Sequence, residues 1–589
     1  MRDGDESTSV EPARDQDESA KGIDYAVEFS GFEPPALLAL VRESSQLLAL
    51  TERKPGTRTA LERRVRSDIE TFDAIFRSEG YYDARVEYRI DEASDPVTVA
   101  IDATPGPLYK LVRYRIAYSG TGSQAKDLVT EMEELGLAVN QPARAEAVVA
   151  ARRRLLDTLA YSGRPLARVL DQRVTVDHAD RSMSVEIDIE PGDLARFSAP
   201  KVIGSNDVKE DYVLGFVPWQ PGDTYSRRQV DRLSRDLIAT GLFGSVAIEQ
   251  ADALAADGTL PITIRLTERE RRSVGLGGSY STDEGLAVEA FWEHRNLFGR
   301  AERLTISGEI GDVRQRVDAE FLKPRFLRPD QSLVANGSLG NENTDAYTGP
   351  LTTGFAGLER EYSRYWLLTL GIASELSSLS DFQGEREFLL VGAVFSALRD
   401  SADDPLNPRD GARLRLRLTP YFGIGDSGVE FLSGVVSGTA YHSPGDADNF
   451  ILAGRVRLAS VAGEPSDALP ANQRLYAGGG GSVRGYAYQS LGPRAPTGQP
   501  IGGRSLVELS AEARLAFSDS LGGAVFVDGG NAYESVLPDF SEPVRWAVGL
   551  GARYFTGFGP LRVDIAFPID RRREFDDPFQ LYVSIGQAF

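Results

Sequence analysis

The stretch SLVELSAEARLAF, residues 505–517, alternates apolar and polar side chains at every second position. A period of two is typical of a β-strand with one apolar and one polar face. In a soluble sandwich the apolar face would be the core. Here charges occupy consecutive positions of the polar face, at Glu508, Glu512 and Arg514. This arrangement favours a strand with lipid outside and a water-filled lumen inside.

The same period continues through the second half of the chain. Leu561–Ile569 alternates in this way, and Arg413, Arg415 and Arg417 interleave with leucines. Residues 271–589 contain no convincing helix, and roughly 20 residues per strand and connection gives about 16 strands, an even number as in bacterial barrels. We therefore predict a transmembrane antiparallel β-barrel over residues 271–589. A soluble β-propeller or sandwich is the alternative.

One long connection, residues 462–502, interrupts this series of strands. It contains the glycine cluster GGGGSVRGY, and its motif residues are Val483, Arg484, Gly485 and Tyr486. A guanidinium inside a barrel needs a counter-charge, which a bidentate carboxylate supplies well. Asp528 is the candidate, because Phe526 and Asp528 share the face of a strand that should point into the lumen. The alternative is a solvated arginine in a flexible surface loop.

The first barrel strand, Val274–Tyr280, is unusual in its composition. It contains Gly275, Gly277 and Gly278, which weaken a strand by entropy and by lost packing. In a closed barrel it must pair with the last segment, whose apolar face begins at Phe579 and ends at Phe589. We expect this seam to open easily. The glycines could equally relieve crowding at a bend of the barrel.

The first half repeats one order of elements three times, strand, helix, helix, strand, strand. Helices are expected at 35–48, 59–78, 125–135, 145–161, 211–217 and 227–240. The predicted organisation is an acidic disordered leader at 1–24, α+β modules at 25–106, 107–192 and 193–270, and the barrel at 271–589. Three generic α/β folds that are alike by chance are the alternative. Modules of this kind have exposed sheet edges that can pair with a partner strand.

Composition excludes several classes of function. The formal net charge of -22 makes nucleic-acid binding unlikely, and the chain has no cysteine. His178, His294 and His442 are too far apart for a local metal motif. No catalytic constellation is evident, so we expect no enzyme, no metal and no cofactor. The acidic leader does not look like a signal peptide, and we expect an export signal to have been removed.

Several short stretches resemble a known family. Val483–Tyr486 and Phe526–Asp528 resemble the lumen-loop motif and its partner strand in the BamA/TamA superfamily of outer-membrane assembly and secretion barrels. The other matching stretches are Glu293–Arg300, Asp404–Pro408 and Gly559–Asp564. The repeated modules are similar to POTRA domains. The resemblance extends over nearly the whole chain after residue 25.

The resemblance implies a 16-stranded outer-membrane barrel with a lateral seam and POTRA domains in the periplasm. Three such modules before a barrel resemble the TamA branch of the superfamily. This resemblance implies a TamB-like inner-membrane partner and unfolded outer-membrane protein clients, autotransporters among them. Phospholipid transport and contact with outer-membrane lipids are further implications. The alternative within the superfamily is a two-partner-secretion-type or passive pore that moves substrate through the lumen.

Overall fold

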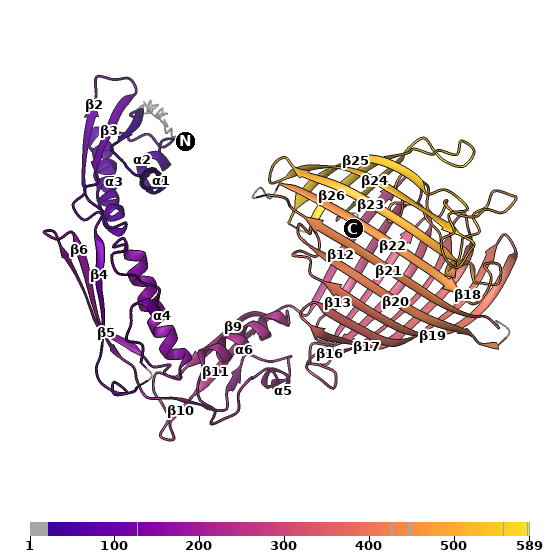
Figure 1. Ribbon diagram of the computed structural model, residues 1–589, viewed down its shortest axis with the longest axis horizontal. Helices are drawn as coiled ribbons and strands as arrows, with labels where there is room; N and C mark the ends of the chain where they lie inside the picture. Colours follow the sequence, from indigo (N-terminus) through magenta and orange to yellow (C-terminus); the bar gives the residue numbers. More distant parts are fainter. Residues whose placement is uncertain are drawn as a thin grey trace, which may run out of the picture. The chain divides into compact units, whose positions relative to one another are not determined.

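The computed structural model describes residues 22–126, 128–425, 428–445, 449–557, 559–585 and 587. Phe589 and most of the predicted acidic leader lie outside the described residues. The chain forms two compact units, which are described separately (Figure 1). The first contains Met1–Ile203, Val217–Asp236 and Ala247–Arg265. The second contains Gly204–Phe216, Leu237–Val246 and Leu266–Phe589, so the division passes through the third predicted module.

The first three-stranded sheet has the order β1-β3-β2 and is covered by helices. Its elements are β1 (Tyr25–Ser30), α1 (Pro35–Ser44), α2 (Gln46–Ala49), α3 (Arg58–Ser78), β2 (Arg85–Asp91) and β3 (Val97–Thr104). The single helix predicted at 35–48 is wrong, because it breaks at Ser45. The buried carboxylate of Asp68 accepts hydrogen bonds from the Ser45 hydroxyl and the Gln46 amide, which fixes a new helix start.

The second sheet has the order β4-β6-β5. Its elements are β4 (Lys110–Tyr118), the 3-10 turn η1 (Glu133–Leu135), α4 (Ala145–Tyr161), β5 (Arg168–Asp177) and β6 (Ser182–Glu190). The helix predicted at 125–135 is wrong, since η1 is the only helical turn among the described residues of that stretch. Gly136 follows at a φ of 73°, a left-handed conformation that ends the turn.

The third sheet has the order β8-β11-β9, and β7 pairs with β10 beside it. The elements are β7 (Arg196–Phe197), β8 (Lys201–Ile203), α5 (Glu210–Leu214), α6 (Arg227–Ala239), β9 (Phe243–Gln250), β10 (Thr259–Leu260) and β11 (Ile262–Glu268). Val230, Leu233 and Leu237 give α6 one buried face. Among the described residues, no helix is long and apolar enough to span a membrane.

The second unit contains the barrel, which is closed by antiparallel neighbours from β12 round to β27. Its strands are β12 (Arg272–Ser281), β13 (Gly285–His294), β14 (Arg303–Gly311), β15 (Arg314–Lys323), β16 (Gln331–Asn343), β17 (Thr348–Ser363), β18 (Trp366–Asp381), β19 (Gly384–Asp400), β20 (Gly411–Gly423), β21 (Glu430–His442), β22 (Phe450–Ala462), β23 (Ser505–Ala516), β24 (Leu521–Tyr533), β25 (Arg545–Thr556), β26 (Gly559–Pro568) and β27 (Gln580–Ile585). The predicted fold class, α+β modules followed by a 16-stranded barrel, is confirmed.

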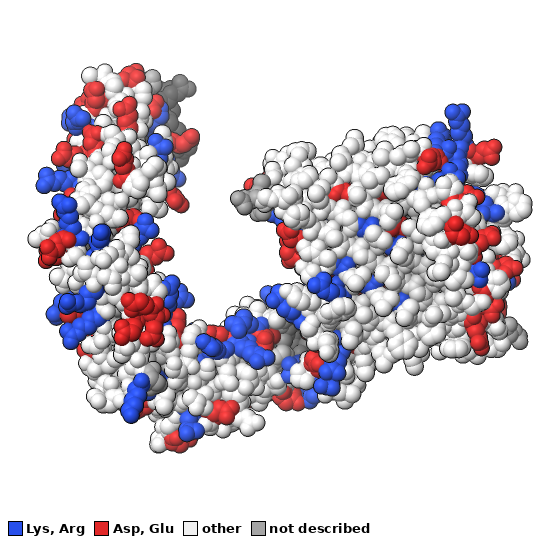
Figure 2. Space-filling view, in the orientation of Figure 1, with Lys and Arg blue, Asp and Glu red and all other residues white. Residues whose placement is uncertain are grey.

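Burial follows the alternation of the sequence. Leu561 and Val563 of β26 are exposed on the outer face, whereas Arg562 and Asp564 on the opposite face are buried. Figure 2 shows charged residues crowding the modules and the barrel rims, while the wall between the rims is mostly uncharged. An uncharged outer band and a polar interior are what lipid requires of a membrane barrel.

Strand direction assigns the connections to the two ends of the barrel. Consecutive strands run in opposite directions, so every second connection lies at the end of the barrel where β12 begins, next to the modules in sequence. The turn between β19 and β20 is one of these connections. The connection between β22 and β23, residues 462–502, lies at the other end. It joins the eleventh and twelfth barrel strands, and we call it the connector.

Candidate functional site

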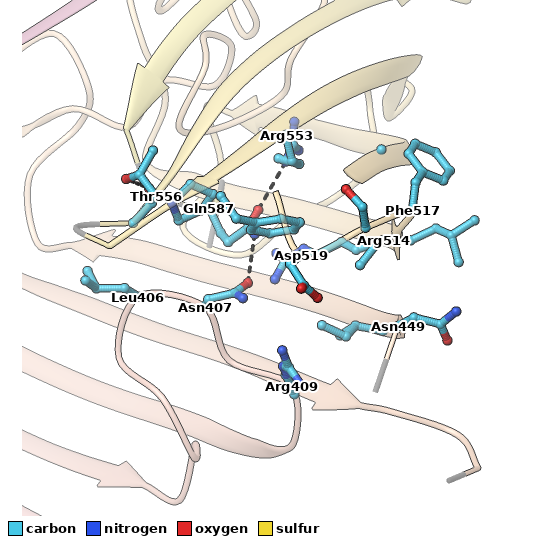
Figure 3. A pocket seen from close by; sticks show the side chains of 18 of the residues that line it. Leu406, Asn407, Arg409, Asn449, Arg514, Phe517, Asp519, Arg553, Thr556 and Gln587 are labelled. Atoms are coloured by element: carbon cyan, nitrogen blue, oxygen red, sulfur yellow. Dashed lines mark hydrogen bonds between the residues drawn. The ribbon is translucent and has the colours of Figure 1, made fainter. Parts of the chain in front are cut away.

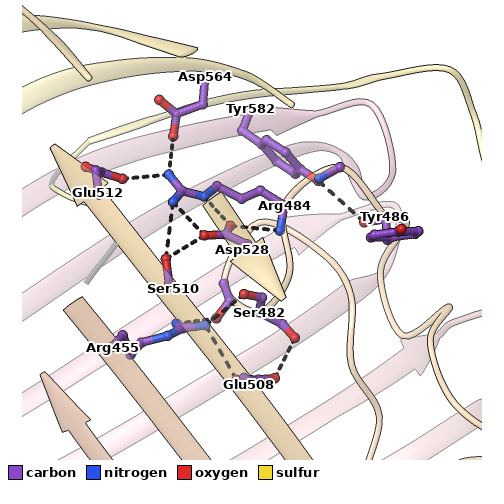
Figure 4. Close-up of polar contacts among 12 residues, drawn as sticks. Arg455, Ser482, Arg484, Tyr486, Glu508, Ser510, Glu512, Asp528, Asp564 and Tyr582 are labelled. Carbon is purple, nitrogen blue, oxygen red and sulfur yellow. Dashed lines mark hydrogen bonds and ion pairs between the residues drawn. The ribbon is translucent and has the colours of Figure 1, made fainter. Parts of the chain in front are cut away.

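Arg484 of the connector lies inside the barrel against Asp528 of β24 (Figure 4). Its Nε and Nη2 donate to the two carboxylate oxygens of Asp528 at 2.7 and 3.0 Å, and its backbone N–H donates to the same carboxylate at 3.1 Å. Both residues are 1% exposed. The guanidinium Cζ also lies 3.4 Å from the ring centroid of Phe526. The structure thus brings together the connector and strand residues singled out in the sequence.

Two further carboxylates, Glu512 of β23 and Asp564 of β26, also hold Arg484. Its Nη1 lies 2.8 Å from Glu512 Oε2 and 3.1 Å from Asp564 Oδ2. Their other oxygens accept hydrogen bonds from the guanidinium of Arg553 on β25. Arg484, Glu512, Arg553 and Asp564 therefore form a closed ring of alternating charge, which we call the lumen ring.

The charges around Arg484 dominate its ionisation. Burial alone would lower the pKa of the guanidinium, but Asp528, through charge and hydrogen bonds, raises it above its ordinary value, with help from Glu512 and Asp564. Arginine is therefore a permanent cation here. A buried pair of this kind is costly to break from one side, because the remaining charge stays in a dry interior.

The other motif residues pack around this contact. Val483 and Tyr486 are fully buried, and the Tyr486 hydroxyl donates to the Trp546 carbonyl at 3.0 Å. Gly485 has a φ of 97°, and a Cβ there would lie 2.8 Å from the Cβ of Ala547. Its N–H donates to the Tyr582 hydroxyl of β27 at 3.2 Å. Glycine at this position lets the connector backbone lie directly on the barrel wall.

Ser482 extends the contact along the wall. Its hydroxyl donates to the buried carboxylate of Glu508 on β23, and its carbonyl accepts a hydrogen bond from Arg455 of β22 at 2.8 Å. Arg455 also reaches the Gly481 carbonyl at 2.7 Å. Backbone and side-chain groups on both sides of Arg484 are therefore held by the barrel.

A second anchor holds the start of the connector to β18, the seventh strand. The Arg474 guanidinium lies 2.7 Å from Asp381, and both side chains are almost completely buried. The Glu375 carboxylate of β18 accepts hydrogen bonds from Asn472 at 2.8 Å and Gln473 at 2.6 Å. The connector thus crosses the lumen from the wall at β18 to the wall formed by β23 to β26.

The barrel seam, where β12 meets β27, is short. Among the described residues its register contains Tyr280↔Val583 and Ser281↔Tyr582. By contrast, β22 and β23 pair without a break from Phe450↔Leu515 to Ser460↔Ser505.

The residues predicted for the seam lie on or near these two strands. Gly275, Gly277 and Gly278 pair with β13 and are absent from the described pairs with β27. Phe579 precedes β27, with its ring 6.3 Å from that of Phe567 on β26.

Sequence reasoning did not find several of these residues. The sequence places Glu512 on the polar face of its strand and Asp564 at the end of a stretch that resembles the superfamily, and it assigns no contact to Arg553, to Tyr582 or to the pair Arg474–Asp381. The alternating pattern places each of the strand residues on the polar face. Their convergence on one guanidinium depends on register across β23 to β27, which a single sequence does not encode visibly.

Comparison with known proteins supports the architecture. The family model described as the Omp85 superfamily domain matches residues 296–589. A POTRA model, described as a surface antigen variable number repeat, matches residues 195–269. The crystal structure of BamA from Haemophilus ducreyi lacking POTRA domains 1–3 superposes with a TM-score of 0.70 at 19% identity, covering 81% of this chain and 100% of that chain. That structure has the same fold.

Curated relatives agree over most of the chain. The outer membrane protein assembly factor BamA of Nitratidesulfovibrio vulgaris is 26% identical over 572 residues, covering 93% of this chain and 71% of that protein. The protein of the same description from Neisseria meningitidis is 20% identical over 651 residues, covering 98% and 79%. Relatives described as assembly factors support the prediction that the chain is not an enzyme. The chain belongs to the BamA/TamA superfamily, with its barrel in the outer membrane and its POTRA modules in the periplasm.

Proposed function

We propose that this protein is an outer-membrane protein assembly factor that inserts unfolded barrel proteins through the seam between β12 and β27. Client strands pair with the free edge of β12 and are released sideways into lipid. The free energy comes from backbone hydrogen bonds and from burial of client side chains in lipid, so no nucleotide or catalytic group is needed. The observation that carries the proposal is that, among the described residues, the seam pairs at Tyr280↔Val583 and Ser281↔Tyr582, with a backbone hydrogen bond from Thr282 to Leu581 beside them.

The edge of β12 suits this role. In lipid an unpaired backbone N–H or C=O costs several kcal/mol, so an edge strand there has a strong drive to find a partner. The glycines at 275, 277 and 278 weaken β12 by entropy and by lost side-chain packing, so the strand is easily separated from a neighbour. Val274 and Leu276 are 79% and 80% exposed, and they present an apolar outer face. An extended client strand fits such an edge by β-augmentation.

A disulfide across the seam tests this proposal. Tyr280 and Val583 are direct cross-strand partners, so cysteines at these two positions lie within the Cα–Cα range that a disulfide spans. We expect the oxidised protein in liposomes to lose the ability to speed folding of a urea-unfolded outer-membrane barrel, and reductant to restore it. Each single variant under oxidant is the control. Full activity of the locked protein would overturn lateral insertion.

The modules contribute a second proposal, an inner-membrane-anchored, TamB-like partner. We assign POTRA modules to 25–106, 107–192 and 193–270, and the resemblance of these modules and the barrel to the TamA branch supports such a partner. The edge strand β2 of the first sheet has alternating exposed positions along its length and is open to an added strand. Phospholipid transport with that partner would use the same edge.

Photo-cross-linking in cells tests the partner. A photoreactive residue in place of Glu87 on β2 should capture an inner-membrane-anchored protein, whereas one in place of Glu70, exposed on α3, should not. Capture from both positions, or from neither, would contradict recognition by the sheet edge. Depletion of this protein distinguishes the two kinds of cargo. Accumulation of unfolded barrel proteins would indicate protein cargo, and a change in lipid asymmetry would indicate lipid cargo.

The connector argues against the pore alternative. A two-partner-secretion-type or passive pore needs an open lumen at the moment of transport. Here the connector is fixed by buried ion pairs at β18 and at β23 to β26. Releasing it would require separating both sets of buried charges, which is expensive.

A further inference from the structure

The periplasmic mouth of the barrel contains a cavity of about 810 Å³. It is lined by residues of four turns, by the strand ends beside them and by Gln587, the last residue that the structure describes. Figure 3 shows Gln587 between Arg553 and Asn407, with a hydrogen bond to each. At this cavity, Gln587, which follows the last strand, therefore contacts the turn between β19 and β20.

The two contacts use both ends of the Gln587 amide. Arg553 Nε donates to Gln587 Oε1 at 3.2 Å, and Gln587 Nε2 donates to Asn407 Oδ1 at 2.9 Å. Asn407 is far from Gln587 in sequence, and Arg553 is only 2% exposed. Gln587 is thus hydrogen-bonded both to a buried residue of the barrel wall and to a periplasmic turn.

The turn that carries Asn407 is held in shape by its own carboxylates. Asp404 Oδ1 accepts the backbone N–H of Leu406 and of Asn407 at 2.7 and 2.8 Å. Asp403 Oδ1 accepts the N–H of Arg409 at 2.9 Å. Burial alone would raise the pKa of Asp403, but these backbone donors lower it, which keeps the carboxylate ionised. A turn fixed in this way can serve as a support for another element.

Arg553 connects this contact to the connector. The same guanidinium that holds Gln587 is a member of the lumen ring and shares Glu512 and Asp564 with Arg484. Arg553 therefore links Gln587, which follows the last strand, to the buried ion pairs that hold the connector.

The pairing of the seam between β12 and β27 indicates the effect of the contact between Gln587 and Asn407. Continuing the register beyond Tyr280↔Val583 would pair Ser279 with Ser584, yet these two described residues are not partners. Pairing stops on the side of the seam toward Gln587. We propose that Asn407 and Gln587 form a clamp that holds the end of the last strand on the lumen side, away from β12. The clamp keeps Ser584 from pairing with Ser279 on the β12 edge, and the lumen ring couples it to the connector.

Disulfide formation between Ser279→Cys and Ser584→Cys measures the clamp directly, because the natural chain has no cysteine. The full-length protein is oxidised in native outer membranes, and the cross-linked fraction is scored only in the folded, heat-modifiable band. The pair Tyr280→Cys and Val583→Cys, already in register, is the matched control and should react at one rate in all backgrounds. This measurement is independent of client assembly, so its failure and that of the proposed function are distinguishable.

Asn407→Ala and Gln587→Ala should each speed the Ser279–Ser584 link by about fivefold, the effect of one hydrogen bond of ordinary net strength. The double variant should be no faster than Gln587→Ala. Asn407→Asp keeps an acceptor for Gln587 Nε2 and should match the parent, a rescue that a general loss of stability would not show. A parental rate in either alanine variant, or a fast rate in Asn407→Asp, would overturn the clamp.

Discussion

Glu512 and Phe526 face each other across the β23–β24 ladder, and the guanidinium of Arg484 lies against both. The carboxylate supplies charge, and the ring supplies a flat surface on which a guanidinium stacks well. A slip of one residue between these strands would turn one of them to the lipid. The binding place of the connector therefore depends on register as well as on residue type.

Arg484→Ala and Asp528→Ala should each lower the free energy of unfolding by about 3–5 kcal/mol, because each leaves a buried charge without its main partner. The double variant should be little worse than either single one, as expected for directly interacting residues. Urea unfolding in detergent micelles provides the measurement. Arg457→Ala, which removes a 38% exposed lumen arginine beside Glu508, is the control and should cost less than about 1 kcal/mol. Additive losses in the double variant would contradict the direct pair.

Gly485→Ala should loosen the connector while Gly481→Ala should not. A methyl group at 485 meets the Cβ of Ala547 at 2.8 Å with a φ of 97°, whereas nothing lies within 4 Å of the position a Cβ would take at 481. Backbone strain of this kind costs of order 1–3 kcal/mol. Limited trypsin digestion of outer membranes should then cut at Arg474, Arg484 or Arg494 in Gly485→Ala alone. Equal protection of the two variants would show that the wall tolerates a side chain there.

Arg474→Ala should raise ion conductance through the barrel, because it removes the buried partner of Asp381 and frees the start of the connector. Single-channel recording in planar bilayers measures this directly. Arg457→Ala is the control, since Arg457 is a 38% exposed lumen arginine whose contact at 3.3 Å is with Glu508 of the barrel wall. Large conductance in the parent protein would instead support the pore alternative.

Asp68→Ala should destabilise the start of α2 by about 2–3 kcal/mol, through the buried donors it leaves unsatisfied. The Asp68 carboxylate accepts the amides of Gln46 and Leu47 at 2.9 and 3.1 Å. Hydrogen exchange of the full chain should show faster exchange at these amides. Glu70→Ala, an exposed change on the same helix, should leave their exchange unchanged.

The barrel was predictable because lipid and lumen impose a strict alternation. Leu414 and Leu416 point outward at 45% and 40% exposure, as their position between arginines requires. The structure of residues 125–135 could not be predicted in this way. Their composition suits a helix, but Val129, Met132 and Leu135 are buried in the core of the second sheet at a spacing of three. Tertiary packing overrode local preference there.

The candidate site was predictable only in part. The link between Arg484 and Asp528 followed from the rule that a buried cation needs an acid. Which other acids share that cation follows from the order and stagger of β23, β24 and β26. Distances across strands carry no signal in one sequence, so Glu512 and Asp564 could be placed on the polar face but not beside Arg484.

The three carboxylates around Arg484 have a consequence for the order in which the barrel folds. Glu512, Asp528 and Asp564 come from three different strands and converge on one guanidinium. Without that guanidinium, the three carboxylates would lose the cation they share, and their mutual repulsion would be stronger as the strands came together. We therefore expect the connector to enter before the last strands close and to act as an internal template for their assembly.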